Sequence, residues 1–132
     1  MISKDLISSN LNYVEFSADG QQGWGVIDGN DIAATADGGA TWMLQVSGTK
    51  ESLHAVSFAA DGRHGWAVGY NGTIVATADG GATWLPQDSG TKESLHAVSF
   101  AADGRHGWAV GATDTIVATA DGGATWLPQD SG

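Results

Sequence analysis

The sequence of 132 residues contains no cysteine and only two prolines. Without cysteine there can be no disulfides and no thiolate metal sites. Basic residues are also scarce, since five Lys and Arg stand against fifteen Asp and Glu, for a formal net charge of −10. Because nucleic acids and anionic membranes attract proteins mainly through Lys and Arg, this balance disfavours both as partners.

Long apolar runs and a secretion signal are missing too. The opening residues MISKDLISSN have no apolar core of the kind that a signal peptide carries, and no apolar run approaches the length of a membrane span. We therefore expect a soluble chain without an export leader, in a compartment that the composition leaves open. Hydrophobic residues make up 42% of the chain and charged residues 15%, which favours a folded chain over a disordered one.

Glycine, by contrast, is abundant, and its 20 residues fall inside a long repeat. The octapeptide TADGGATW occurs three times at a spacing of 42 residues, at Thr35–Trp42, Thr77–Trp84 and Thr119–Trp126. We divide the chain into a leader at 1–10, which could add a strand, and three units at 11–48, 49–90 and 91–132. Repeats of this length indicate an array of similar structural units in one domain.

The second and third units are almost identical. They differ only where Tyr70, Asn71 and Gly72 of the second unit become Ala112, Thr113 and Asp114 of the third. Such copying indicates either a very recent duplication or deliberate construction, and the residues do not distinguish the two histories.

Each unit is predicted to form four short antiparallel strands. In the second unit these are LHAVSF, GWAVG, TIVAT and TWLPQ, and no span shows helical periodicity. Asn71-Gly72 predicts a type I′ hairpin turn, because both residue types tolerate positive φ. Pro86 and Pro128 fall in the fourth strand and predict an edge position, since proline cannot donate to a ladder. A repeat of about 40 residues with four strands is typical of a β-propeller blade.

The predicted fold class is therefore all-β, with three propeller blades in the chain. Three blades do not close a ring and would leave two apolar faces exposed. The last face of one chain should fit the first face of another, head to tail. We expect a homodimer that closes a six-bladed propeller, and we favour it over a nine-bladed trimer.

The octapeptide combines three structural features. Its Asp can accept backbone N–H bonds inside a tight turn, its second Gly can adopt positive φ, and its Trp supplies apolar area to the blade. The pattern Ser/Thr-x-Asp-x-Gly-x-Thr-Trp resembles the Asp-box, or bacterial neuraminidase repeat. It is matched at Thr35, Asp37, Gly39, Thr41 and Trp42, at Thr77, Asp79, Gly81, Thr83 and Trp84, and at Thr119, Asp121, Gly123, Thr125 and Trp126.

The resemblance implies a hairpin turn between the third and fourth strands of a blade, remote from any active site. The fuller pattern of Val56–Trp84, with V-x-F, GWAVG and T-x-DGG-x-TW, is similar to photosystem II assembly and stability factor-like repeats. That resemblance covers nearly all of 11–132 and implies a protein-binding factor that helps to build a photosynthetic membrane complex.

We predict no catalytic residue, no metal site and no cofactor. The Gly-rich octapeptide lacks the Lys and the helix of a phosphate loop, and DGND at 28–31 lacks the downstream Glu of a calcium loop. A sialidase needs an arginine cluster, whereas this chain has only Arg63 and Arg105. These two and the adjacent His64 and His106 are weak candidates for a ligand surface.

The remaining aromatic and histidine residues are read as structural. Trp24, Trp66 and Trp108 are predicted to form the blade core, and His54 and His96 to lie on first strands. The leading interpretation is a non-catalytic repeat protein that assembles with itself into a propeller. The alternatives are a protein-binding module of the photosystem II assembly type and a carbohydrate-binding propeller with pockets between blades.

Overall fold

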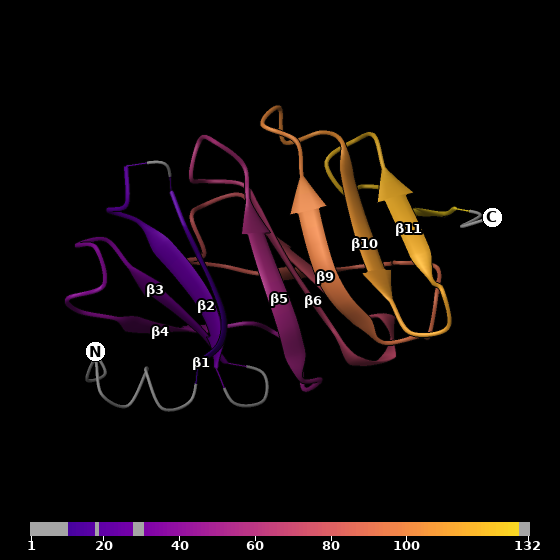
Figure 1. Cartoon of the computed structure of the whole chain (residues 1–132), viewed down its shortest axis with the longest axis horizontal. Helices are drawn as coiled ribbons and strands as arrows, with labels where there is room; N and C mark the ends of the chain where they lie inside the picture. The colour runs from indigo at the N-terminus through magenta and orange to yellow at the C-terminus, as the bar shows by residue number, and fades with distance from the viewer. Residues whose placement is uncertain (1–10, 18, 28–30, 130–132) are drawn as a thin grey trace.

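A computed structural model describes residues 11–17, 19–27 and 31–129, and this part of the chain forms three four-stranded antiparallel sheets. The sheets lie side by side in chain order, from the indigo strands at one side to the orange and yellow strands at the other (Figure 1). Within the described residues no helix is long and apolar enough to cross a membrane. The predicted leader at 1–10 lies outside the described residues.

Each predicted unit contains one sheet, which we call a blade. Blade 1 comprises β1 (Leu11–Phe16), β2 (Gly23–Ile27), β3 (Asp31–Thr35) and β4 (Met43–Val46). Blade 2 comprises β5 (Leu53–Phe58), β6 (Gly65–Gly69), β7 (Ile74–Thr77) and β8 (Leu85–Gln87), with a short 3-10 turn η1 (Tyr70–Gly72) after β6. Blade 3 comprises β9 (Leu95–Phe100), β10 (Gly107–Gly111), β11 (Ile116–Thr119) and β12 (Leu127–Pro128).

Strands that follow one another in the sequence are neighbours in every blade. The prolines lie on edge strands, as predicted: Pro86 of β8 pairs with Val75 of β7, and Pro128 of β12 pairs with Val117 of β11. An edge strand tolerates a residue without an N–H because one of its sides makes no ladder bonds.

The predicted hairpin turn between β6 and β7 is confirmed. Asn71 and Gly72 have φ of 58° and 72°, and the Thr73 N–H donates to the Tyr70 carbonyl at 3.1 Å. These angles match a type I′ turn. In blade 3 the corresponding Thr113 and Asp114 adopt the same conformation, with φ of 59° and 58°. A β-branched residue in this region is strained, so blade 3 makes the same turn from a less suitable sequence.

The hydrophobic core lies between blades and forms two clusters. One joins blade 1 to blade 2 and contains Trp24, Val26, Ile32, Leu53, Val56, Ala67, Val75 and Trp84. The other joins blade 2 to blade 3 and contains Ala55, Ala59, Trp66, Val68, Ile74, Leu95, Val98, Ala109, Val117 and Trp126. Blade 2 therefore buries apolar side chains on both of its faces, in keeping with the apolar residues on both sides of GWAVG.

An aromatic stack stands at the centre of each of these contacts. Trp24 of blade 1 stacks on Phe58 of blade 2 with ring centroids 3.7 Å apart, and Trp66 of blade 2 stacks on Phe100 of blade 3 at 3.4 Å. The other side of each Phe ring rests on a glycine of its own blade. A Cβ on Gly107 would lie 2.6 Å from the Phe100 ring, so no larger residue fits there without a shift.

The two outer faces of the array have no neighbouring blade within the described chain. Trp108 is 47% exposed, whereas the corresponding Trp24 and Trp66 are 4% and 2% exposed. Trp108 was predicted to be a core residue of a closed ring, and in the single chain it is about half exposed, because within the described residues no blade covers this face of blade 3. On the opposite face, Val14 and Phe16 of blade 1 are 38% and 42% exposed. The all-β, propeller-type architecture is present, with both of its ends open.

The strained turn of blade 3 leads to a first prediction. Replacing Thr113 by Asn and Asp114 by Gly gives blade 3 the turn sequence of blade 2, and should raise the free energy of unfolding by roughly 1–2 kcal/mol. Residues strained in the left-handed region cost about 1–3 kcal/mol each. The greater freedom of Gly in the unfolded chain offsets part of the gain. Chemical denaturation of the variant and the wild type measures this difference.

The reverse exchange in blade 2 provides the control. The double variant Asn71→Thr, Gly72→Asp should lower the free energy of unfolding by more than the blade 3 exchange raises it. A Cβ on Gly72 would lie 1.9 Å from the Thr91 carbonyl oxygen. Equal stability of all three proteins would show that the turns carry no strain.

Candidate functional site

The three Asp-box turns have the same internal hydrogen bonds. In blade 2, Oδ1 of Asp79 accepts from the Thr77 hydroxyl at 2.7 Å and from the Thr83 N–H at 2.9 Å, while Oδ2 accepts from the Thr83 hydroxyl at 2.6 Å. The Gly81 N–H donates to the Thr77 hydroxyl oxygen at 3.0 Å. Asp37 of blade 1 and Asp121 of blade 3 accept from the equivalent groups.

These bonds occupy both oxygens of each carboxylate. Because they stabilise the ionised form, they lower the pKa of Asp37, Asp79 and Asp121 from 3.8 to about 2, and the bond from the Thr83 hydroxyl is the largest cause at Asp79. Each carboxylate holds its own turn together. A second ligand such as a metal ion would have to displace those bonds, so the Asp-box turns are structural parts of the blades.

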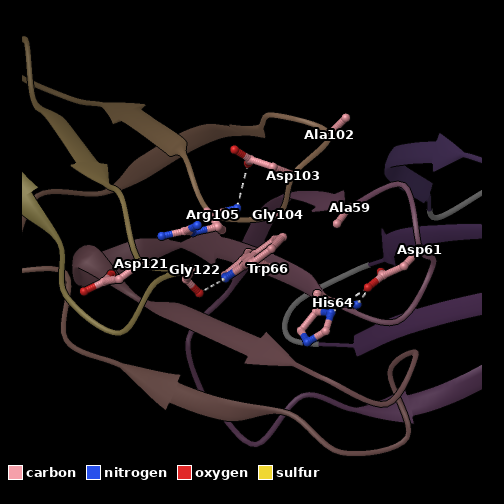
Figure 2. A pocket seen from close by; sticks show the side chains of 10 residues that line it. All are labelled: Ala59, Asp61, His64, Trp66, Ala102, Asp103, Gly104, Arg105, Asp121 and Gly122. Carbon is pink, nitrogen blue, oxygen red and sulfur yellow. Dashed lines mark hydrogen bonds and ion pairs between the residues drawn. The ribbon is translucent and has the colours of Figure 1, made fainter.

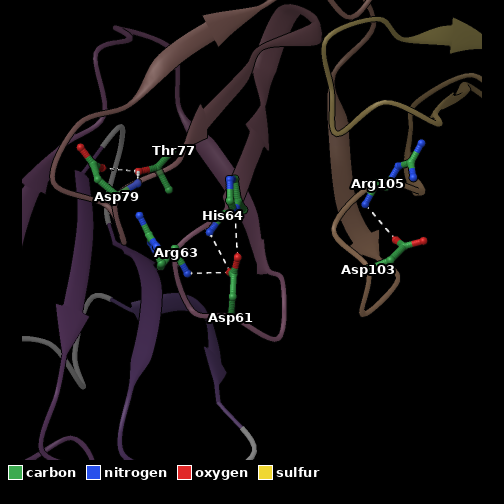
Figure 3. A network of polar contacts seen from close by, with 7 residues as sticks. All are labelled: Asp61, Arg63, His64, Thr77, Asp79, Asp103 and Arg105. Atoms are coloured by element: carbon green, nitrogen blue, oxygen red, sulfur yellow. Dashed lines mark hydrogen bonds and ion pairs between the residues drawn. The ribbon is translucent and has the colours of Figure 1, made fainter.

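A second set of turns carries the predicted Arg and His residues. In blade 2, Oδ1 of Asp61 accepts from the N–H groups of Arg63 at 2.8 Å and His64 at 3.1 Å, and Oδ2 lies 2.7 Å from Nδ1 of His64. Figure 3 shows this network around Asp61. The backbone bond from Arg63 is the largest cause that lowers the pKa of Asp61 to about 2. The imidazole is thereby held against its own turn.

Blade 3 repeats this turn with Asp103, Arg105 and His106, and the pKa of Asp103 is likewise lowered to about 2, chiefly by the bond from the Arg105 N–H. In each blade the carbonyl of the Arg also accepts an N–H from the Asp-box turn, from Gly80 to Arg63 at 2.9 Å and from Gly122 to Arg105 at 3.0 Å. The two kinds of turn therefore lie together along one edge of the blades.

A pocket of about 550 Å³ opens on this edge between blades 2 and 3. In Figure 2 the indole of Trp66 lies near its centre, with Asp61 and His64 on one side and Asp121 on the other. The Trp66 N–H donates to the Gly122 carbonyl at 3.0 Å. At the junction of blades 1 and 2 the corresponding pocket measures only about 170 Å³. There Gln22 replaces His64, and its side chain lies close over Gly62.

The guanidinium groups of Arg63 and Arg105 are exposed, and in the part of the chain that the structure describes neither forms an ion pair or a side-chain hydrogen bond. They are two of only five basic residues in a chain of net charge −10. Since a guanidinium carries five donors suited to carboxylates and carbonyls, these two groups are available to a ligand. The structure therefore brings the four candidate residues Arg63, His64, Arg105 and His106 to one edge.

The histidines of the first strands lie elsewhere. The rings of His54 on β5 and His96 on β9 are 5.4 Å apart, and Nε2 of His54 is buried without a hydrogen-bond partner. Burial, followed by the neighbouring His96, lowers the pKa of His54. Within the described residues no three His, Asp or Glu side chains gather closely enough to hold a metal ion.

Sequence reasoning missed the polar contacts that join one blade to the next. The indole N–H of Trp126 donates to Oε1 of Gln87 at 3.1 Å, and that of Trp84 lies 3.4 Å from Oε1 of Gln45. Glu15 accepts from the Phe58 N–H at 2.8 Å. One signal was available, because Gln recurs at 45, 87 and 129 with the period of the repeat.

The family model of the photosynthesis system II assembly factor YCF48 matches residues 43–126, which is more than half of the chain. The chain belongs to this family. No curated protein matches it.

Solved structures of the family superpose on almost all of the chain. YCF48 bound to D1 peptide is 26% identical, with a TM-score of 0.76 over 92% of this chain and 41% of that one. YCF48 from Cyanidioschyzon merolae is 23% identical, with a TM-score of 0.74 over 90% of this chain and 39% of that one. U3-55K, at 7% identity, has a TM-score of 0.77 over 89% of this chain and 38% of that one, and shares the fold alone. The chain thus spans about two fifths of the length of these structures.

The Asp-box geometry leads to a second prediction. A folded pKa of about 2 against an ordinary 3.8 means that each Asp contributes stability above about pH 4 and loses it as the pH falls towards 2. Asp79→Asn removes one such group, so the variant should be less stable at neutral pH and its stability should depend less on pH between 4 and 2. Denaturation curves measured across this range test both effects.

A second variant acts on the same bond from the other side. Thr83→Val keeps the Asp79 carboxylate but removes the hydroxyl that donates to it, so the folded pKa of Asp79 should lie closer to 3.8. The loss of stability on acidification should then be smaller and should end at a higher pH than in the wild type. Acid profiles of both variants that overlay the wild-type profile would contradict the structural role of this carboxylate.

Proposed function

We propose that this chain is a non-catalytic, protein-binding propeller module of the assembly-factor type, and that it binds a segment of another protein along the edge that carries Arg63 and Arg105. Membership of the YCF48 family supports protein binding, since a family structure holds a D1 peptide. The single observation that carries the proposal is the exposed guanidinium of Arg105 at the pocket between blades 2 and 3, which Arg63 repeats on the equivalent turn of blade 2.

The chemistry of this edge favours a polypeptide over a small metabolite. At the rim of its pocket Arg105 offers an exposed guanidinium, whereas the nearby carboxylates are bonded within their own turns and Trp66 is only 2% exposed. A guanidinium suits the carbonyl oxygens and carboxylates that a polypeptide presents along its length.

The self-assembling scaffold is the second candidate, and a separate observation favours it. Both outer blade faces expose apolar groups, with Trp108 and Val110 on blade 3 and Val14 and Phe16 on blade 1. We propose that a second copy covers them and completes a six-bladed homodimer, in preference to a nine-bladed trimer. A carbohydrate-binding propeller has less support, because five of the six tryptophans are at most 5% exposed.

Peptide binding is tested with the D1 peptide of the related complex as the probe. Arg63→Gln with Arg105→Gln should weaken its binding about tenfold or more, because a hydrogen bond to a charged group contributes about 1.5–3 kcal/mol. The turns should stay intact, since only the backbone atoms of these residues hold them. Lys50→Gln, which removes an exposed charge outside this edge, is the control. Equal affinity of all three proteins would refute binding at the Arg edge.

Ring completion is tested by the mass of the wild-type chain in solution. Native mass spectrometry or light scattering should give twice the chain mass of 13.5 kDa at micromolar concentration. A folded species of single-chain mass at the highest soluble concentration would refute the homodimer, and a mass of three chains would replace it by the trimer.

A further inference from the structure

We infer that a second copy of this chain docks head to tail through one defined set of contacts, in which Trp108 of one copy stacks on Phe16 of the other. This inference rests on the proposed ring completion and specifies its interface. The surface is the outer face of blade 3, and its occupant is the outer face of blade 1 of another copy.

The chain itself shows which surface fits this face. Each internal junction stacks a Trp of the second strand of one blade on a Phe of the first strand of the next, with interplanar angles of 11° for Trp24–Phe58 and 6° for Trp66–Phe100. Trp108 is the equivalent Trp of blade 3, and within the described residues no Phe stacks on it. Phe16 is the equivalent Phe of blade 1, and within the same residues no second-strand Trp stacks on it. The two ends therefore offer the two halves of one contact.

The aliphatic residues around the stack are matched in the same way. Val68 of blade 2, which faces blade 3, is fully buried, whereas the equivalent Val110 of blade 3 is 40% exposed. Val56 of blade 2, which faces blade 1, is fully buried, whereas the equivalent Val14 of blade 1 is 38% exposed. Exposure at each end thus falls on those positions that the internal junctions bury.

The hydrogen bonds across the internal junctions also have counterparts on the two outer faces. Trp24 and Trp66 donate their indole N–H groups to the carbonyls of Gly80 and Gly122 in the following blade, at 3.4 and 3.0 Å. By the same step along the repeat, Trp108 should donate to the Gly38 carbonyl of the second copy. The indole N–H of Trp42 in blade 1 instead bonds within its own turn to the Gly39 carbonyl at 3.0 Å.

Gln129 of the second copy is the expected hydrogen-bond acceptor for the indole N–H of Trp42. Gln45 and Gln87 accept indole N–H groups from the next blade, whereas the Gln129 amide in blade 3 only reaches the adjacent Pro128 carbonyl at 3.4 Å. On docking, Trp42 should exchange its bond to Gly39 for one to Gln129 of the second copy. The contact is heterologous, because the blade 3 face complements the blade 1 face and does not complement itself.

The test uses one variant blocked at each end. Trp108→Arg blocks the blade 3 face, and Val14→Lys blocks the blade 1 face. Because both residues are already partly exposed, each single chain should still fold. Near-ultraviolet circular dichroism of each variant verifies folding. Each variant alone should associate at least about thirtyfold more weakly than the wild type, the loss expected for a buried aromatic anchor. An equimolar mixture should form a dimer by light scattering, because it retains one intact pair of faces.

The outcomes separate this contact from the proposals on which it rests. Self-association of Val14→Lys at wild-type strength would show an isologous contact of blade 3 faces and would overturn the inference, as would a mixture that remains monomeric. A wild-type trimer with complementing variants would support the contact while refuting the six-bladed ring. A monomeric wild type would refute both, and binding of the D1 peptide would still test the Arg edge separately.

Discussion

The structure depends on a flat aromatic contact between consecutive blades. A Trp from the second strand of one blade lies against a Phe from the first strand of the next, and the Phe rests on a glycine of its own second strand. The glycine is needed because any side chain there would occupy the volume of the ring. Each blade therefore lacks a complete core of its own, and stability depends on nearest neighbours, as in other repeat proteins.

Much of the fold could be predicted from the repeat. The period of 42 residues located the blades, Asn71-Gly72 located a hairpin turn, and Pro86 located an edge strand. These features are local, because the conformational limits of Asn, Gly and Pro act through the backbone of the residue itself. Apolar residues on both sides of GWAVG also indicated that both faces of a blade are covered.

The contacts between blades could not be predicted in the same way. That Trp66 reaches forward to Phe100, and that Trp126 reaches back to Gln87, depends on the angle between adjacent sheets, which no local pattern encodes. For the same reason Trp108 was expected in a core although it is half exposed in the single chain. The candidate ligand residues were found by type and position, but the pocket between Asp61 and Asp121 arises only when two blades are placed side by side.

The groups that hold the turns together differ from the groups that we propose for ligand binding on the same edge. The Asp-box carboxylates are occupied by the Thr and backbone donors of their own turns, and Asp61 is occupied by the backbone of Arg63 and by His64. The guanidinium groups are the part of these turns that internal bonds leave available. A change at Arg63 or Arg105 should thus have little effect on folding and would act on the proposed recognition, whereas a change at the neighbouring aspartates acts on the fold first.

A closed ring has more junctions per blade than a single open chain. A single chain makes two junctions for its three blades, and a closed ring makes one junction for every blade. When two chains close a ring, the first contact carries the loss of translational and rotational freedom, and the second then forms within one complex at a high effective concentration. In the proposed ring the second junction would therefore strengthen a pair of chains that one head-to-tail contact already joins. Both junctions together would shield Trp108 of each copy from water.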